Sequence, residues 1–215
     1  MAFLTQSRFP TLWKAFQFWI GGSMDKQRLY GSLLDDPKNV LEVGCSLGNT
    51  ANVFIRREGV RYTGIDIDQV VIEHAQRAFR DVPNAEFVCE DLRAFAAREQ
   101  NQGRFDHVMF AGICHHIDDA MVVELLRAAR ALLPEGGRVV VVDPLIPRQQ
   151  DSWMLRTYMK HLEQGEHLRE HEAMLALIEQ LPEYELVRED TTFVGAMPNS
   201  WFKVARFGIY LLRPR

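Results

Sequence analysis

The sequence of 215 residues has little cysteine, no long apolar run and no surplus of basic residues. Its three cysteines, Cys45, Cys89 and Cys114, are odd in number and far apart, which argues against a disulfide framework and a metal site. No stretch approaches the roughly 20 apolar residues that span a bilayer, and the first residues lack the pattern of a secretory signal. We therefore expect a cytoplasmic protein with reduced thiols, no membrane span and no metal.

The charge balance argues against one class of partner. Lys and Arg number 25, Asp and Glu number 29, and the formal net charge is −4. Proteins that bind phosphate backbones concentrate Lys and Arg, so nucleic acid is not expected as the partner. The chain is 47% hydrophobic and 25% charged, as globular proteins are, and its length suits one domain. The oligomeric state stays open.

Aromatic residues, strand–helix alternation and prolines divide the single domain into parts of different character. The parts are a helical cap (1–37), a core (38–143), a lid or insertion (144–182) and a pair of edge strands (183–215). Apolar periodicity predicts helices outside the core over 12–20, 25–34, 152–161 and 170–181. Strands are expected over 185–192 and 202–212, as an antiparallel pair at the edge of a sheet.

The core alternates short apolar runs with helical patterns. Strands are expected over 39–43, 62–67, 85–89, 105–111 and 138–142. Helices are expected between them over 50–57, 70–79, 91–98 and 119–133. Alternation of this kind predicts right-handed crossovers and a parallel sheet with helices on its faces.

The strongest local signal is the run LEVGCSLG over residues 41–48, in which an apolar strand enters a tight turn before a helix. Gly44 and Gly48 allow the backbone to turn sharply and to approach a ligand closely. Ligands of open parallel sheets bind at the carboxyl ends of the strands. The turn is therefore a candidate binding site, although two glycines alone are weak evidence.

Acidic residues follow the same strands. Glu42 lies in the first strand, Asp66 closes the second and Asp91 follows the third. A carboxylate at the position of Asp66 can accept hydrogen bonds from both hydroxyls of a ribose. For each acid, a solvated surface position or a helix N-cap is the competing interpretation.

The runs VLEVGCSLGNTA, YTGIDID and FDHVMFAGICHHI, with the pair Glu90-Asp91, resemble class I S-adenosylmethionine-dependent methyltransferases. The resemblance covers about residues 38–143. It implies an α/β, Rossmann-like, doubly wound sheet of seven strands, mostly parallel with an antiparallel last strand and helices on both faces. It also implies S-adenosylmethionine as the cofactor and S-adenosylhomocysteine as the product.

The resemblance assigns roles along the cofactor. Glu42 would orient the methionine part, and the backbone of the glycine turn would pack against it. Asp66 would hold the ribose and Ile67 would pack on the adenine. The remaining cofactor contacts that it implies are Gly44, Cys45, Ser46, Gly48, Asp91, Leu92, Ala111 and Gly112.

Ser46 departs from the family, which usually has glycine there. A Cβ restricts positive φ, so we expect a slightly remodelled turn or a hydrogen bond from Ser46 to the cofactor. The rival ligand, a dinucleotide, needs all three glycines of G-x-G-x-x-G. This chain has Ser46 and Asn49 at two of those positions, which favours a methionine-type ligand.

Candidates for a general base lie after the fourth strand, at His115 and His116. The donor is already activated, so positioning and removal of one proton supply most of the catalysis. Adjacent histidines are expected to point in different directions, so at most one would face the cofactor. The competing interpretation is a structural histidine, with Asp118 or Asp119 capping the next helix.

The acceptor pocket is expected to draw on aromatic side chains. Trp19 in the predicted N-terminal helix, Tyr30, Tyr158 and His116 are candidates for acceptor binding, which would make the acceptor partly hydrophobic or aromatic. Aromatic residues at helical spacing are, however, more often part of a core.

The sequence therefore predicts methyl transfer from S-adenosylmethionine to O, N or C of a small molecule. The alternative is a cofactor-binding regulatory or non-catalytic module with the same fold. A Rossmann-type oxidoreductase is disfavoured by the glycine spacing.

Overall fold

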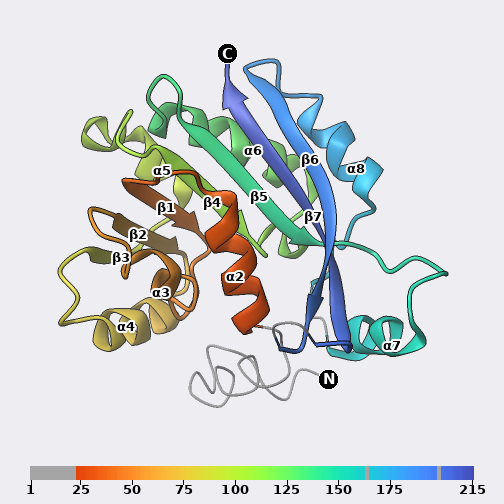
Figure 1. Cartoon of the computed structure of the whole chain (residues 1–215). Helices are drawn as coiled ribbons and strands as arrows, with labels where there is room; N and C mark the ends of the chain where they lie inside the picture. The colour runs from red at the N-terminus through yellow and green to blue at the C-terminus, as the bar shows by residue number, and fades with distance from the viewer. Residues whose placement is uncertain (1–22, 163–164, 198–199) are drawn as a thin grey trace.

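The computed structural model describes residues 23–162, 165–197 and 200–215. The helix expected over 12–20, which carries Trp19, lies outside these residues. Seven strands form one sheet through the molecule (Figure 1). They are β1 (Asn39–Val43), β2 (Arg61–Asp66), β3 (Ala85–Cys89), β4 (His107–Ala111), β5 (Arg138–Pro144), β6 (Tyr184–Gly195) and β7 (Lys203–Pro214).

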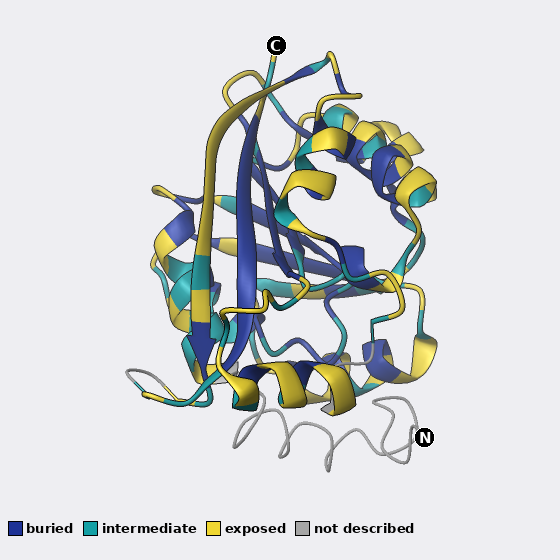
Figure 2. Ribbon diagram, turned by 90° about the vertical axis from the view of Figure 1, so that its right-hand side faces the viewer, coloured by how far each residue is buried: buried dark blue, intermediate teal, exposed yellow. Residues whose placement is uncertain are grey.

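The strand order is β3-β2-β1-β4-β5-β7-β6. The first five strands pair in parallel, and β7 is antiparallel to both β5 and β6. This confirms the predicted Rossmann-like, mostly parallel sheet with an antiparallel last strand. The expected antiparallel pair lies at the edge of the sheet, with β6 outermost. Figure 2 shows how its two strands differ: β7 is buried along almost its whole length, whereas most of β6 is exposed.

Helices cover both faces of the sheet, as predicted. On one face, buried apolar side chains come from α2 (Ser23–Leu33), α3 (Ala51–Phe54), α4 (Gln69–Ala78) and α7 (Trp153–Leu162). On the other face they come from α5 (Leu92–Ala97), α6 (Asp119–Ala129) and α8 (His171–Ile178). Helix α8 packs into the core beside α6 through Met174, Leu177 and Ile178. None of the described helices is both long and apolar enough to cross a membrane.

The helix expected over 50–57 is shorter in the structure, where α3 ends at Phe54. Arg57 donates hydrogen bonds to the carbonyls of Gly31 and Leu34 in and after α2. The chain then reverses at Gly59, which has a φ of +75°. These contacts redirect the chain toward β2 after one helical turn.

The turn after β1 is held by hydrogen bonds to β2. The amides of Gly44 and Cys45 both donate to the carbonyl of Ile65, at 2.8 and 3.0 Å. The amide of Ser46 donates to Oδ2 of Asp66 at 2.9 Å. Ser46 adopts a φ of +50°, so this serine occupies the left-handed region that favours glycine. Its backbone thus follows the glycine-like path, and Asp66 holds it there.

Gly48 is required by packing as well as by backbone conformation. Its φ is +73°, and a Cβ built there would lie 2.8 Å from the ring of Phe87 and 2.9 Å from that of Phe79. Replacing Gly48 with alanine should lower the free energy of unfolding by about 2–5 kcal/mol. The left-handed backbone contributes about 1–2 kcal/mol of this loss and overpacking about 1–3 kcal/mol.

Gly59→Ala is the matched control. The φ of Gly59 is +75°, but a Cβ there meets no atom within 4 Å. This variant should lose only the backbone contribution, which urea unfolding of both variants measures. Equal losses for the two variants would show that the aromatic rings impose no constraint on Gly48.

Candidate functional site

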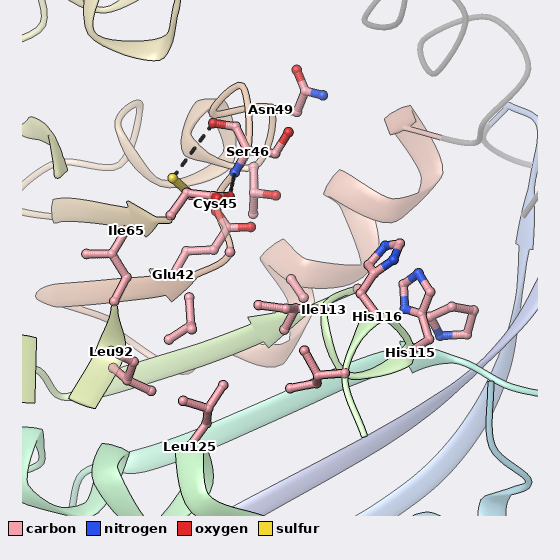
Figure 3. Close-up of a pocket in the computed structure, with 18 of the residues that line it drawn as sticks. Glu42, Cys45, Ser46, Asn49, Ile65, Leu92, Ile113, His115, His116 and Leu125 are labelled. Atoms are coloured by element: carbon pink, nitrogen blue, oxygen red, sulfur yellow. Dashed lines mark hydrogen bonds between the residues drawn. The ribbon is translucent and has the colours of Figure 1, made fainter. Parts of the chain in front are cut away.

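A cavity of about 580 Å³ lies at the carboxyl ends of β1, β2 and β4. Figure 3 shows the side chains that line it, from the glycine turn on one side to the two histidines on the other. The predicted site residues that line this cavity are Tyr30, Glu42, Gly44, Cys45, Ser46, Asp66, Ile67, Asp91, Leu92, Ala111, Gly112, His115, His116 and Tyr158. A volume of this size lies within the ~300–1,000 Å³ range of small-molecule pockets.

Two predicted residues are not among those that line it. Trp19 lies outside the described residues. Gly48 lies behind the turn, where it packs against the rings of Phe79 and Phe87. Gly44 faces the cavity, and a Cβ on it would lie 2.4 Å from Cδ1 of Ile113. The first glycine of the turn therefore shapes the cavity wall, while the second shapes the core beneath it.

Glu42 is a buried carboxyl group in the cavity wall, with 2% of its surface exposed. The hydroxyl of Tyr62 donates a hydrogen bond to Oε2 of Glu42. Burial raises the pKa of Glu42 to about 7, although hydrogen bonds from Tyr62 and Thr50 act in the opposite direction. A carboxyl group in this state gains strongly from a cation beside it, because the cation offsets the cost of desolvating the negative charge.

Asp66 and Ile67 lie at the end of β2. Each carboxylate oxygen of Asp66 accepts one backbone hydrogen bond, from Ser46 at 2.9 Å and from Asp68 at 3.0 Å. A carboxylate oxygen has two acceptor positions, so both oxygens keep capacity for a ligand hydroxyl. Ile67 is 76% exposed although it is apolar and lines the cavity. A flat apolar ligand that covers this side chain would remove that surface from water.

Asp91 has the structural role that was the competing interpretation. Its side chain accepts from the amide of Arg93 and caps α5. It also forms two hydrogen bonds with the guanidinium of Arg93, at 2.8 and 2.9 Å. These bonds lower the pKa of Asp91, so it is a carboxylate held against the rim of the cavity. If the adenine of the cofactor contacts Asp91, it has to share the carboxylate with the guanidinium of Arg93.

The histidines lie in a short 3-10 helix, Cys114–His116, after β4. Their rings are 4.0 Å apart between centroids, and both line the same cavity (Figure 3). The expectation that their side chains diverge is wrong, because ring packing brings them together. Nδ1 of His115 lies 3.1 Å from Oδ1 of Asp143, and both residues are buried. The competing prediction for the neighbouring acid is confirmed: Asp118 accepts from the amide of Met121 and caps α6.

Side chains from α2, α7 and β7 also line the cavity, and Tyr30 and Tyr158 are among them. Residues that the sequence analysis missed are Lys26, Pro144, Val204, Ala205 and Phe207.

Asp143 was also missed. It follows the apolar run of β5 as the other acids follow their strands, so the signal was present in the sequence. The contacts of Lys26 and of β7 depend on tertiary packing and carry no local signal. Among the described residues, no group of three or more His, Cys, Asp or Glu side chains could hold a metal ion.

The strand order, the turn after β1 and the carboxylate at the end of β2 together define the class I methyltransferase fold. The chain matches the family model described as "Methyltransferase domain" over residues 22–180. It therefore belongs to this family of S-adenosylmethionine-dependent methyltransferases, and S-adenosylmethionine is its cofactor. The residues present fit this cofactor, because the raised pKa of buried Glu42 identifies a place where a cation is favoured.

Curated relatives share part of the chain. Caffeic acid 3-O-methyltransferase 2 of Ocimum basilicum is 26% identical over 129 residues, which are 60% of this chain and 33% of that protein. Malonyl-[acyl-carrier protein] O-methyltransferase 1 of Ilyobacter polytropus is 28% identical over 102 residues, 47% of this chain and 36% of that protein. The chain thus spans about a third of the length of these relatives.

Solved structures share the fold. A SAM-dependent methyltransferase from Aquifex aeolicus has a TM-score of 0.67 at 13% identity, over 97% of this chain and 98% of that one. The mitomycin 7-O-methyltransferase MmcR has a TM-score of 0.66 at 19% identity, over 89% of this chain and 53% of that one. The [4+2]-cyclase SpnF has a TM-score of 0.63 at 17% identity, over 88% of this chain and 80% of that one.

Cofactor binding should weaken in acid, because protonation of Glu42 removes the charge that favours a cationic ligand. A cation beside Glu42 lowers its pKa from about 7. When binding is measured at a pH about one unit below 7, it should therefore release close to one proton. Calorimetry with S-adenosylmethionine in two buffers of different ionisation enthalpy measures this release. Glu42→Gln should bind more weakly and release no such proton; an unchanged release in that variant would contradict the role of Glu42.

The same shift has the opposite consequence for the cofactor-free protein. Folded Glu42 holds its proton more tightly than unfolded Glu42, so the free energy of unfolding should fall as the pH rises from 4.5 to about 7. Below 4.5 both states are protonated, and the contribution is constant. Urea unfolding across this range should show the decline in the wild-type protein and a smaller decline in Glu42→Gln.

Proposed function

We propose that this protein transfers the methyl group of S-adenosylmethionine to a hydroxyl oxygen of a small molecule, with His115 as the general base. The observation that carries the proposal is the buried pair of His115 and Asp143 in the wall of the cofactor cavity. The curated relatives named above are O-methyltransferases, which supports oxygen over nitrogen or carbon as the acceptor atom.

Asp143 orients the imidazole. Its Oδ1 lies near Nδ1 of His115 at 3.1 Å and also accepts from the amide of Cys114 at 3.0 Å. A carboxylate at Nδ1 favours the tautomer with the proton on that nitrogen, which leaves Nε2 as the proton acceptor. A Cβ built on Gly112 would lie 3.8 Å from Cε1 of the ring, which places this edge of His115 beside the cavity-lining Gly112.

The cofactor supplies a methyl group that is already activated as a sulfonium. Glu42 would orient its methionine part, and Asp66 would accept hydrogen bonds from the ribose hydroxyls. Ile67 and Leu92 would cover the adenine, with Ala111 and Gly112 contributing backbone contacts. Asp91 would reach the adenine only from its cap position on α5.

The acceptor would occupy the end of the cavity that Tyr30, Tyr158 and Phe207 line. These rings favour an acceptor that is partly hydrophobic or aromatic. Lys26 lies at the same end and would favour an acceptor with a negative charge or an acidic hydroxyl. A small molecule of this kind suits the cavity better than nucleic acid does, and the three free cysteines suit the cytoplasm.

The alternative is a domain that binds the cofactor without transferring its methyl group. The observation that favours it is the likeness of this fold to a protein described as a [4+2]-cyclase. Labelled S-adenosylmethionine incubated with hydroxylated aromatics, carboxylic acids, amines and a metabolite extract separates the two. Labelled methyl ethers or esters are expected, whereas cofactor binding without any labelled product would favour the alternative.

With an acceptor from this screen, His115→Gln should lower kcat by about 10²–10⁴-fold, the usual contribution of a general base. Asp143→Asn should lower kcat in the same direction, because the imidazole loses its orienting carboxylate. His116→Gln shows whether the second histidine shares the role, and His74→Gln in α4, which is not among the residues that line the cavity, is the control. Unchanged kcat in His115→Gln would overturn His115 as the base.

A further inference from the structure

Five residues after α7 lie directly against the turn that carries the histidines. We call this segment, 165–169, the strap. The amide of His167 donates to the carbonyl of His115 at 2.9 Å. Gly165 lies against the imidazole itself, since a Cβ built there would come within 2.2 Å of Cδ2 of His115. The strap therefore contacts both the backbone and the ring of the proposed base.

Arg169 fastens the strap to the histidine turn. Its Nη1 donates to the carbonyl of Cys114 at 2.6 Å, and its Nη2 donates to the carbonyl of Ile117 at 2.8 Å. These two carbonyls flank His115 and His116 on either side. One planar guanidinium thus spans the whole turn, which a single ammonium group cannot do with the same geometry.

The same side chain is itself fixed. Arg169 is 7% exposed, and its Nε donates to Asp119 at 2.7 Å. Its Nη1 also donates to the carbonyl of His167 at 3.0 Å, inside the strap. Its backbone carbonyl accepts from the amide of Ile146, three residues beyond Asp143. The strap, the histidine turn and the end of β5 are therefore joined at Arg169.

We propose that Arg169 is a positioning residue for His115. It acts through the carbonyls of Cys114 and Ile117, and it holds the strap so that Gly165 and Asp143 confine the imidazole from two sides. The arrangement fixes which edge of the ring faces the acceptor. This inference rests on the proposed function only for its catalytic consequence, because the confinement of the ring is a property of the cofactor-free protein.

The test uses the full chain without any acceptor. Two-bond ¹H–¹⁵N spectra report the tautomer of His115, and hydrogen exchange reports the amide of His167. In the wild-type protein one tautomer, with the proton on Nδ1, should dominate. Arg169→Lys should give a mixture of tautomers and exchange the His167 amide at least ~10-fold faster, since lysine cannot bridge both carbonyls. The affinity for S-adenosylmethionine, measured by calorimetry, should stay within about twofold because the cofactor contacts lie elsewhere.

Arg127→Lys is the matched control, because Arg127 also donates to a backbone carbonyl, that of Gln180. It should leave both readings unchanged. An unaltered His115 tautomer and His167 exchange rate in Arg169→Lys would overturn the proposal.

Gly165→Ala leaves the Arg169 side chain in the protein and adds a methyl group that would lie 2.2 Å from Cδ2 and 2.7 Å from the backbone oxygen of His115, so the ring or the strap must shift. It keeps the proposal testable if Arg169→Lys does not fold. A displaced or mixed His115 tautomer supports the confinement, and an unchanged tautomer contradicts it. All of these readings are independent of turnover, so a failure to find an acceptor would count against the proposed function and not against the strap.

Discussion

The site depends on one hydrogen-bonded constraint, the attachment of the turn after β1 to the end of β2. Three successive amides, those of Gly44, Cys45 and Ser46, donate to Ile65 and Asp66. Because the bonds run to a neighbouring parallel strand, the turn cannot move without moving the carboxylate of Asp66. Glu42 precedes this turn in β1 and Asp66 ends β2, and both line the cavity. The attachment of the turn therefore fixes the two acids relative to each other.

The acidic residues around the cavity differ in their burial and in their hydrogen-bond partners. Glu42 is buried and its pKa is raised to about 7. A positively charged ligand beside it would therefore stabilise its ionised form. Asp143 instead receives the amide of Cys114 and faces His115, and Asp91 is committed to Arg93. The positively charged methionine part of the cofactor would complement Glu42, and Nδ1 of His115 is the partner of Asp143. This division agrees with the proposal that the cofactor binds near the turn and that the proton acceptor lies at the histidines.

Much of this arrangement was predictable because it follows strand ends. Glu42 and Asp66 were predicted from acids in and after parallel strands, Ile67 was predicted from the family resemblance, and all three line the cavity. Gly48 was placed at the cofactor, but the rings of Phe79 and Phe87 account for it.

What the sequence did not reveal depends on contacts between distant segments. Arg169 reaches the carbonyls of Cys114 and Ile117 across more than 50 positions, with separations of 55 and 52. The tilted contact between the rings of His115 and His116 likewise follows from how the turn is held. Ser46 differs from these residues because its departure from glycine was visible in the sequence. Its positive φ was not visible there, and in the structure its amide donates to Asp66.

The central claim is that the cavity between the glycine turn and the histidines holds the cofactor with its reactive end toward His115. A crystal structure of the complex with S-adenosylhomocysteine tests this most directly. The account predicts the ribose hydroxyls on Asp66, the adenine against Ile67 and the sulfur on the side of the cavity that His115 lines. A ligand bound elsewhere, or bound in this cavity with its sulfur directed away from His115, would contradict it.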